Sequence, residues 1–359
     1  MESRAVSKPL NFRNGKSRLY TFIYDNNGKY KIPKFNDVRV STMTIICYTN
    51  LIINIDKFFE YIPTTDFVSI KKKRGRKKKI QPEDPNRHIP PGSIISVSNK
   101  KDVSGTVIKT KKKSGNFFRH SVTTIMMLED KKMLNVKISK QGKFQMTGCK
   151  NIQNAIDFMK YLYSLLIETE EWIGETLFTY KTDNLDLEDS TEDIGIFQRE
   201  TNNGLMATFK VAMMNIDFSA GYKIRRDLLN NFINKYTEYR SIYESSITTS
   251  VNIKIKSNNK FDKQLHRLRI THEGDCIEEQ IAFEDFFGEL SKKEQEDDNK
   301  KEAFHTFRVF ASGSITMSSS GMEMANVFYK LVKLLIENRE RIEEKEGNDV
   351  NIETEWLDE

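Results

Sequence analysis

The chain has 359 residues, of which 38% are apolar, 11% are aromatic and 30% are charged, with a formal net charge of +6. Such a composition supports a packed core beside solvated segments and excludes a wholly disordered chain. The start of the chain lacks the apolar stretch of a signal peptide, and no apolar run reaches membrane-spanning length, so we expect a soluble intracellular protein with no membrane partner.

The charges are distributed unevenly along the chain. Residues 71–79 read Lys-Lys-Lys-Arg-Gly-Arg-Lys-Lys-Lys, whereas residues 168–200 and 337–359 are rich in carboxylates. We predict that the basic run is a solvated tether near nucleic acid, because it attracts phosphates. It also resembles an AT-hook with Lys77 in place of the usual proline, and a nuclear-localisation signal is an equal or better interpretation. The cations of this basic tether are Lys71, Lys72, Lys73, Arg74, Arg76, Lys77, Lys78 and Lys79.

Apolar periodicity predicts alternating strands and helices behind a flexible arm at residues 1–32. The acidic segment after residue 168 carries apolar residues between 172 and 180, which we expect either to fold back or to bind a partner. The predicted elements are a strand from about Val38, a helix over 56–61, a small hairpin over 93–97 and 107–110, strands over 122–128 and 134–138, a helix from about 151 to 166, a strand over 209–217, a helix that includes Leu229 and Ile233, and strands over 249–256 and 304–310.

Two distant stretches share one design, in which a strand, a tight turn and a second strand lead into an amphipathic helix. They are residues 136–150 and 308–321, and their turns contain Gly142 and Gly313, where a hairpin needs a residue that tolerates positive φ. This self-similarity predicts a duplicated domain. Duplication produces a pseudo-two-fold molecule, which suits a nearly two-fold target such as double-stranded DNA.

Each of the two helices carries one apolar stripe at i, i+3, i+4 and i+7 spacing. We expect each stripe to be buried on the strand pair that precedes it. The stripes consist of Ile152, Ala155, Ile156, Met159, Leu162, Tyr163 and Leu166 in the first copy and of Met324, Val327, Phe328, Leu331, Leu334 and Leu335 in the second.

The order of short motifs resembles that of the TATA-box-binding protein family, whose two repeats each carry a Ser-Gly-Lys hairpin, then Thr-Gly-Ala-Lys and a long helix. The resemblance covers roughly residues 35–63, 117–167, 207–256 and 303–338. The matching motifs are Gly142-Lys143, Thr147-Gly148-Cys149-Lys150, Ser312-Gly313-Ser314, Val40-Ser41-Thr42, Phe209-Lys210-Val211 and Ile224-Arg225-Arg226-Asp227.

The resemblance implies an α+β fold, a duplicated saddle in which one curved antiparallel sheet carries helices on its convex face and long insertions. We expect both repeats to lie in this one sheet. The implied domains are an N-terminal arm (1–32), repeat one (33–167) with a basic insertion (64–116), an acidic linker (168–206), repeat two (207–338) with a second insertion (257–302), and an acidic tail (339–359).

The family binds the DNA minor groove through the concave sheet face, where phenylalanines wedge between base steps. The matching positions place Lys143 and Lys150 at phosphates and keep Phe310 as a wedge. Because Ser314 and Gly321 replace the lysines in repeat two, we expect repeat one to carry most phosphate contacts. The implied DNA-binding residues are Val40, Lys143, Gln145, Thr147, Lys150, Asn215, Phe310, Thr316 and Ser318.

The match on this face is incomplete. The family's paired asparagines correspond to Val38 and Met213. The wedge positions of repeat one correspond to Val122 and Ser139, with a Phe-Phe pair nearby at 117–118. These departures put a preference for TATA sequences in doubt, whereas DNA binding itself depends mainly on phosphate contacts.

Other motifs indicate neither catalysis nor a metal site. The run from His272 to Cys276, His-Glu-Gly-Asp-Cys, lacks a second ligand cluster at metal spacing, and we interpret it as a polar surface turn. Cys47, Cys149 and Cys276 show no pairing pattern and are expected to be reduced thiols. We therefore expect neither enzymatic activity nor a cofactor.

The resemblance implies a basal transcription initiation factor that binds promoter DNA as a monomer and recruits RNA polymerase together with factors of the IIB type. The long insertions and the richness in Lys, Ile and Asn resemble versions encoded by large DNA viruses. The expected compartment is the nucleus or, for a viral protein, a cytoplasmic viral factory or the virion. The alternative is a protein–protein scaffold of the same fold, within a transcription complex, that no longer bends or reads DNA.

Overall fold

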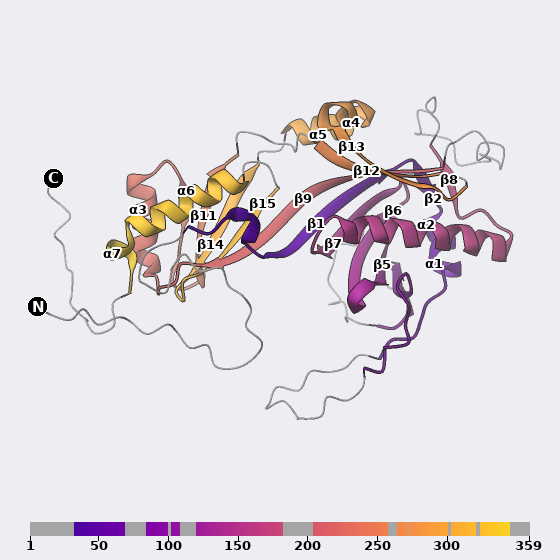
Figure 1. Ribbon diagram of the computed structural model, residues 1–359, viewed down its shortest axis with the longest axis horizontal. Coiled ribbons are helices and arrows are strands. Elements are labelled where there is room, and N and C mark those ends of the chain that lie inside the picture. Colours follow the sequence, from indigo (N-terminus) through magenta and orange to yellow (C-terminus); the bar gives the residue numbers. More distant parts are fainter. Residues whose placement is uncertain are drawn as a thin grey trace, which may run out of the picture.

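One large antiparallel sheet with helices packed on it organises the chain (Figure 1). The computed structural model describes residues 32–68, 84–99, 102–107, 120–181, 204–257, 264–271, 273–300, 303–320 and 324–344. No helix in these ranges has the length and apolar character to cross a membrane. The strands are β1 (Val40–Thr49), β2 (Leu51–Ile53), β3 (Ile94–Asn99), β4 (Asp102–Gly105), β5 (Ser121–Leu128), β6 (Lys132–Ser139), β7 (Lys143–Cys149), β8 (Phe178–Tyr180), β9 (Leu205–Ser219), β10 (Arg240–Ile242), β11 (Ser250–Lys256), β12 (Gln264–Ile270), β13 (Cys276–Ala282), β14 (Phe304–Phe310) and β15 (Ser314–Ser319). The helices are α1 (Ile55–Tyr61), α2 (Gln153–Ile173), α3 (Arg226–Tyr236), α4 (Phe283–Glu289), α5 (Lys292–Lys300), α6 (Met324–Glu337) and α7 (Arg339–Ile342).

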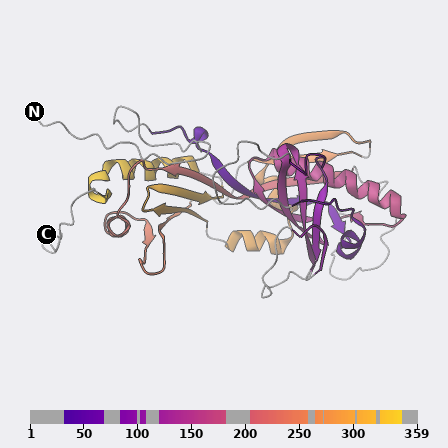
Figure 2. The same cartoon turned by 90° about the horizontal axis from the view of Figure 1, so that it is seen from below.

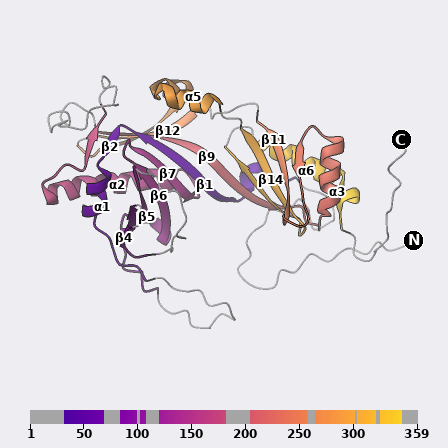
Figure 3. The same cartoon turned by 180° about the vertical axis from the view of Figure 1, so that it is seen from behind.

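The order of strands in the sheet repeats on the two sides of a central pair. The long strands β1 and β9 pair antiparallel and run across the middle of the molecule (Figures 1 and 3). Beyond β1 follow β7, β6, β5, β3 and β4, and beyond β9 follow β15, β14, β11 and β10. The predictions of an α+β fold and of both repeats in one antiparallel sheet are therefore confirmed.

The two hairpin turns make equivalent backbone hydrogen bonds. The Gly142 carbonyl accepts the N–H of Thr49 at 3.0 Å, and the Gly313 carbonyl accepts the N–H of Ala220 at 2.8 Å. Each glycine N–H also donates to the last residue of the strand before it. Each turn thus ties its hairpin to the end of the long central strand of its own repeat, so the duplication extends to individual hydrogen bonds.

Two apolar cores lie between the sheet and its helices. The first core joins α1 and α2 to the sheet of repeat one, and the second joins α3, α6 and α7 to the sheet of repeat two. Both predicted helix stripes are confirmed, because every stripe residue is buried except Ile152 and Leu334, which are half-buried and pack against the cores. Phe328 of α6 anchors the second core, with its ring 4.9 Å from that of Phe218.

Helix α2 continues to Ile173, beyond the end expected near Leu166 and into the segment expected to be an acidic linker. The extra turns keep contact with the core, since Thr169 and Glu170 are buried. Gly174 then ends the helix in the left-handed conformation, with φ of +69°.

The chain folds back after α2, which was one of the two alternatives for the apolar residues of this segment. Leu177, Phe178 and Tyr180 are buried in the first core, and β8 pairs with β2. The Glu170 carboxylate accepts the N–H of Leu177 at 2.5 Å and that of Phe178 at 3.1 Å, which fixes the return of the chain. Trp172 is different, since it is 78% exposed.

Both insertions contribute strands to the main sheet. In the first insertion, β3 pairs with β5 and with β4, so the hairpin expected at 93–97 and 107–110 has its second strand at Asp102–Gly105 instead. The hairpin is present, but its second strand lies earlier than expected and ends at Gly105, with φ of +78°, and residues 108–110 lie outside the described residues. In the second insertion, β12 pairs with β9 and β13, and α4 and α5 follow.

The cysteines should differ sharply in reactivity. Burial raises the pKa of the Cys47 thiol well above its usual value and that of Cys149 to about 11, whereas Cys276 is exposed at the first position of β13. We therefore expect iodoacetamide to modify Cys276 in the folded protein and all three cysteines after denaturation, as measured by mass spectrometry. Modification of Cys149 at the rate of Cys276 would contradict the packing of the first core.

Candidate nucleic-acid interface

Strand alternation gives the sheet two chemically different faces. One face is buried beneath α2 and α6; we call the opposite one the open face. Residues directly opposed on antiparallel strands share a face. Ile45 and Cys47 of β1 are buried in the first core, so Thr44 and Ile46 lie on the open face, as do their opposed partners on β7, Thr147 and Gln145.

Five of the predicted DNA-binding residues lie on the open face near the central strands. Thr147 donates its hydroxyl to the carbonyl of Asn135 at 3.1 Å, and Thr316 donates to the Asp217 carboxylate at 2.9 Å. Among the described residues, the side-chain oxygen of Asn215 has no hydrogen-bond partner. These five residues are Gln145, Thr147, Asn215, Thr316 and Ser318.

Val40 is on the other face, contrary to the place on the DNA-binding face that the resemblance implied for it. A β-bulge shifts the register between Val40 and Thr42, so that Val40 opposes Ile216 and Thr42 opposes Asn215. Ile216 is buried in the second core, and Val40 packs against the same core. The extra residue at the bulge reverses the alternation that would otherwise place Val40 on the open face.

Strand β14 presents Phe310 as the alternation predicts. Val309 is buried in the second core together with α6, and Phe310 is half-buried on the open face. Arg308 is exposed on the same face, with its guanidinium carbon 5.7 Å from the centre of the Phe310 ring. A cation and an aromatic ring therefore lie together on this strand.

The open face of repeat two carries further cations that were not predicted from the sequence. Lys254 and Lys256 alternate with buried residues of β11, and Arg240 opposes Lys254 from β10. All three are exposed. The Lys254 ammonium lies 5.9 Å from the centre of the Phe304 ring. Period-two alternation with Val251, Ile253 and Ile255 is the sequence signal that could have predicted the facing of Lys254 and Lys256.

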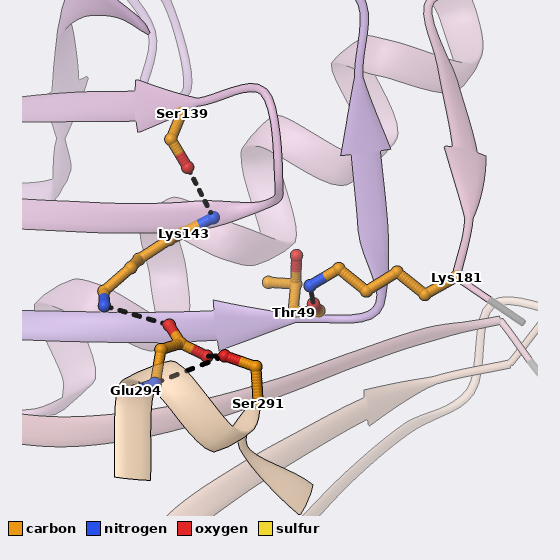
Figure 4. Close-up of polar contacts among 6 residues, drawn as sticks. All are labelled: Thr49, Ser139, Lys143, Lys181, Ser291 and Glu294. Atoms are coloured by element: carbon orange, nitrogen blue, oxygen red, sulfur yellow. Dashed lines mark hydrogen bonds and ion pairs between the residues drawn. The ribbon is translucent and has the colours of Figure 1, made fainter. Parts of the chain in front are cut away.

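Lys143, predicted to contact phosphate, forms an ion pair within the protein (Figure 4). Its ammonium lies 3.2 Å from the Glu294 carboxylate of α5 and 4.6 Å from the centre of the Tyr48 ring. Partial burial disfavours the charged form of Lys143 and lowers its pKa. The electrostatic attraction and hydrogen bonds of Tyr48 and Glu294 have the larger combined effect, so the pKa of Lys143 is raised. Glu294 also accepts the Ser291 hydroxyl at 3.0 Å, and Lys181 donates to the Thr49 carbonyl beside them.

The other positions matched to the family lie in different surroundings. Lys150 is exposed at the end of β7, and its ammonium donates to the Ser41 carbonyl. Of the positions matched to asparagines, Val38 is buried in the second core and Met213 is 41% exposed on the open face. Val122, matched to a wedge, is buried in the first core.

The second insertion covers part of the open face of repeat one. Leu265 of β12 and Phe283, Phe286 and Leu290 of the α4 region form a small apolar cluster against Tyr48 of β1. The rings of Phe286 and Tyr48 are 5.1 Å apart. Figure 2 shows α5, the orange helix, on the opposite side of the sheet from α6.

The first insertion covers the same face at the outer strands. Ile89 and Ile95 are buried with Met127 of β5, and Phe67 and Ile125 pack against them. Ile125 opposes Asn135, which in turn opposes Thr147 of the open face. Both insertions therefore add apolar residues in front of repeat one.

Several predicted features lie outside the described residues: the basic tether at 71–79, the Phe-Phe pair at 117–118, Gly321 and His272. Glu273 and Asp275 belong to the turn between β12 and β13, where the Thr271 hydroxyl accepts the N–H of Asp275 at 3.1 Å, and Cys276 begins β13. In the part of the chain that the structure describes, no three His, Cys, Asp or Glu side chains gather as a metal site requires.

Comparisons with known proteins give distant relatives. No protein-family model matches the chain. The chain is 26% identical over 207 residues to a "TATA-box-binding protein-like" protein of Acanthamoeba polyphaga mimivirus, covering 56% of this chain and 46% of that protein. It is 23% identical over 239 residues to "Uncharacterized protein 335L" of Invertebrate iridescent virus 6, covering 64% of this chain and 62% of that protein. It thus spans less than two thirds of each relative.

One solved structure that aligns with the chain is the TBP of Methanococcus jannaschii. The alignment covers 84% of this chain and 98% of that one, with a TM-score of 0.37 and 10% identity.

Proposed function

We propose that this chain, a distant member of the TATA-box-binding-protein-like family, is a transcription initiation factor that binds promoter DNA through the open face of its sheet. The helix-covered side would then recruit RNA polymerase with a factor of the IIB type. Trp172 on α2, which is 78% exposed, offers that side an aromatic anchor.

The observation that carries this proposal is the pairing of cations with aromatic rings on the open face. Arg308 lies over Phe310 and Lys254 over Phe304, beside the small polar side chains of Thr316 and Ser318. Exposed cations neutralise phosphates, flat rings stack on or between bases, and short polar side chains permit close approach to a groove. A surface that served only apolar protein docking would have little use for these charges.

A salt-titrated binding assay tests the proposal. The protein is mixed with fluorescent A·T-rich duplex, G·C-rich duplex and single-stranded DNA, and binding is followed by anisotropy. We expect duplex binding whose logarithmic affinity falls by about 0.9 per phosphate contact for each tenfold rise in salt. Absence of duplex binding at 50 mM salt would contradict DNA binding.

The alternative function, a scaffold that no longer bends DNA, is favoured by one observation. The apolar cluster around Phe286 already occupies part of the face that a duplex would approach. On this alternative, the protein would bind a IIB-type factor from the same source but no duplex. Measuring both interactions on one preparation separates the two functions.

A further inference from the structure

We infer that the second insertion is a fixed shield over the repeat-one half of the open face, so that nucleic acid contacts the repeat-two half. This inference rests on the proposed DNA binding. It reverses the expectation that repeat one supplies most phosphate contacts, and it sets the size and asymmetry of the bound site.

The base of the shield is part of the main sheet. Strand β12 pairs with β9 from His266 opposite Phe209 to Ile270 opposite Leu205. Leu268 and Ile270 are buried in the first core, on the helix-covered side. Lifting the whole insertion off the sheet would therefore break a strand pairing and open a core, which a loosely docked arm would not require.

The upper part of the shield is held by apolar packing. Phe283, Phe286 and Leu290 are each at most 8% exposed, and Leu265 beneath them is 2% exposed. Displacing α4 would return these side chains to water and uncover Tyr48. DNA that entered this half would have to overcome that cost.

A buried cation fixes the same contact. Arg267 of β12 is 6% exposed; it donates to the Thr208 hydroxyl of β9 at 2.9 Å and to the Glu289 carboxylate of α4 at 2.5 Å. Separating α4 from the sheet would break this hydrogen-bonded ion pair between Arg267 and Glu289. A single side chain therefore links strand β9, strand β12 and helix α4.

Two cations on the shielded half of the open face make contacts inside the protein that partly cover them. Lys143 pairs with Glu294, and the Lys210 ammonium lies 5.4 Å from the centre of the Phe283 ring. In repeat two, Arg308 and Lys254 also lie near aromatic rings but are exposed, whereas Lys143 and Lys210 are half-buried. Among the described cations of the open face, phosphate attraction should therefore be concentrated on repeat two, and the bound duplex should be short and contacted asymmetrically.

Lysine acylation read by mass spectrometry, with and without an A·T-rich duplex, tests the shield on the whole chain. We expect the duplex to slow acylation of Lys254 and Lys256 at least threefold and to leave that of Lys143 and Lys210 unchanged. Hydrogen exchange of residues 283–300 should not increase when DNA is added. Protection of Lys143 and Lys210, or faster exchange in 283–300, would overturn the inference and indicate a cover that DNA displaces.

Matched substitutions give a second measurement. Arg308→Ala with Lys254→Ala should weaken duplex binding at least tenfold at low salt and reduce the salt slope by about two contacts. Lys143→Ala with Lys210→Ala should change affinity less than twofold, and equal losses in the two pairs would overturn the inference.

Failure of the proposed function is distinguishable from failure of the shield. If no variant binds DNA, DNA binding is wrong, and the shield is judged from the free protein. In the free protein, Lys143 should be acylated more slowly than Lys254, and Glu294→Gln should increase the acylation rate of Lys143. The control Asp297→Asn removes the same charge from an exposed residue of the same helix and should leave that rate unchanged. Equal rates for Lys143 and Lys254 would overturn the shield as well.

Discussion

Gly142→Ala and Gly313→Ala should each lower the free energy of unfolding by about 3 kcal/mol or more, because each adds a side chain to a left-handed turn that also lacks room. The φ angles are +67° at Gly142 and +79° at Gly313. A Cβ at Gly142 would lie 2.1 Å from the Leu51 carbonyl oxygen, and one at Gly313 would lie 2.0 Å from that of Tyr222. Urea denaturation followed by circular dichroism measures both variants.

Gly174→Ala is the matched control, since Gly174 has φ of +69° but no atom within 4 Å of an added Cβ. It should cost only the backbone strain, about 1 kcal/mol. If Gly142→Ala and Gly313→Ala cost no more than this control, the tight contacts of the two hairpin turns with the Leu51 and Tyr222 carbonyls are incorrect. Similar large losses of stability in both variants would show that the hairpin turns of the two repeats depend on glycine for the same reason.

The sequence was most informative where local rules agree with tertiary packing. Turn glycines and apolar stripes are short-range patterns, so the hairpins around Gly142 and Gly313 and the helices after them were predictable. Helix α2 was predicted too short, because its last turns carry acidic residues and their burial depends on β8 folding back. Strand β12 was not predicted, since both its faces are partly covered and Leu265, Arg267, Leu268 and Ile270 give no clean alternation.

The candidate site was less predictable than the fold for two physical reasons. A single extra residue in β1 reverses the facing of Val40, and a bulge depends on the partner strand as much as on the bulged one. The neighbour of Lys143 is Glu294, which is remote in sequence, so no local motif reveals the ion pair. Motif matching located the correct strands, whereas contacts across the fold decide which side chains are available.

Phe307→Ala and Phe310→Ala should have opposite effects, because these residues lie on the two faces of β14. Phe307 is fully buried in the second core, so its truncation should lower the free energy of unfolding by about 3–5 kcal/mol. Phe310 is half-buried on the open face, so its truncation should leave thermal stability nearly unchanged. If Phe310 inserts between bases, Phe310→Ala should reduce the bend of the duplex. It should also weaken the binding free energy by up to a few kcal/mol, about the scale of one unstacked step.

Stability is measured by thermal denaturation, and binding and bending are measured by anisotropy and end-to-end energy transfer well below the melting temperature of Phe307→Ala. At that temperature Phe307→Ala should bind like the unmodified protein, because its side chain does not reach the open face. The comparison separates loss of fold from loss of contact, since the two residues share a strand, a side-chain type and a substitution. If Phe310→Ala instead melts several degrees lower and binds DNA normally, Phe310 has a structural role, and the scaffold function gains support.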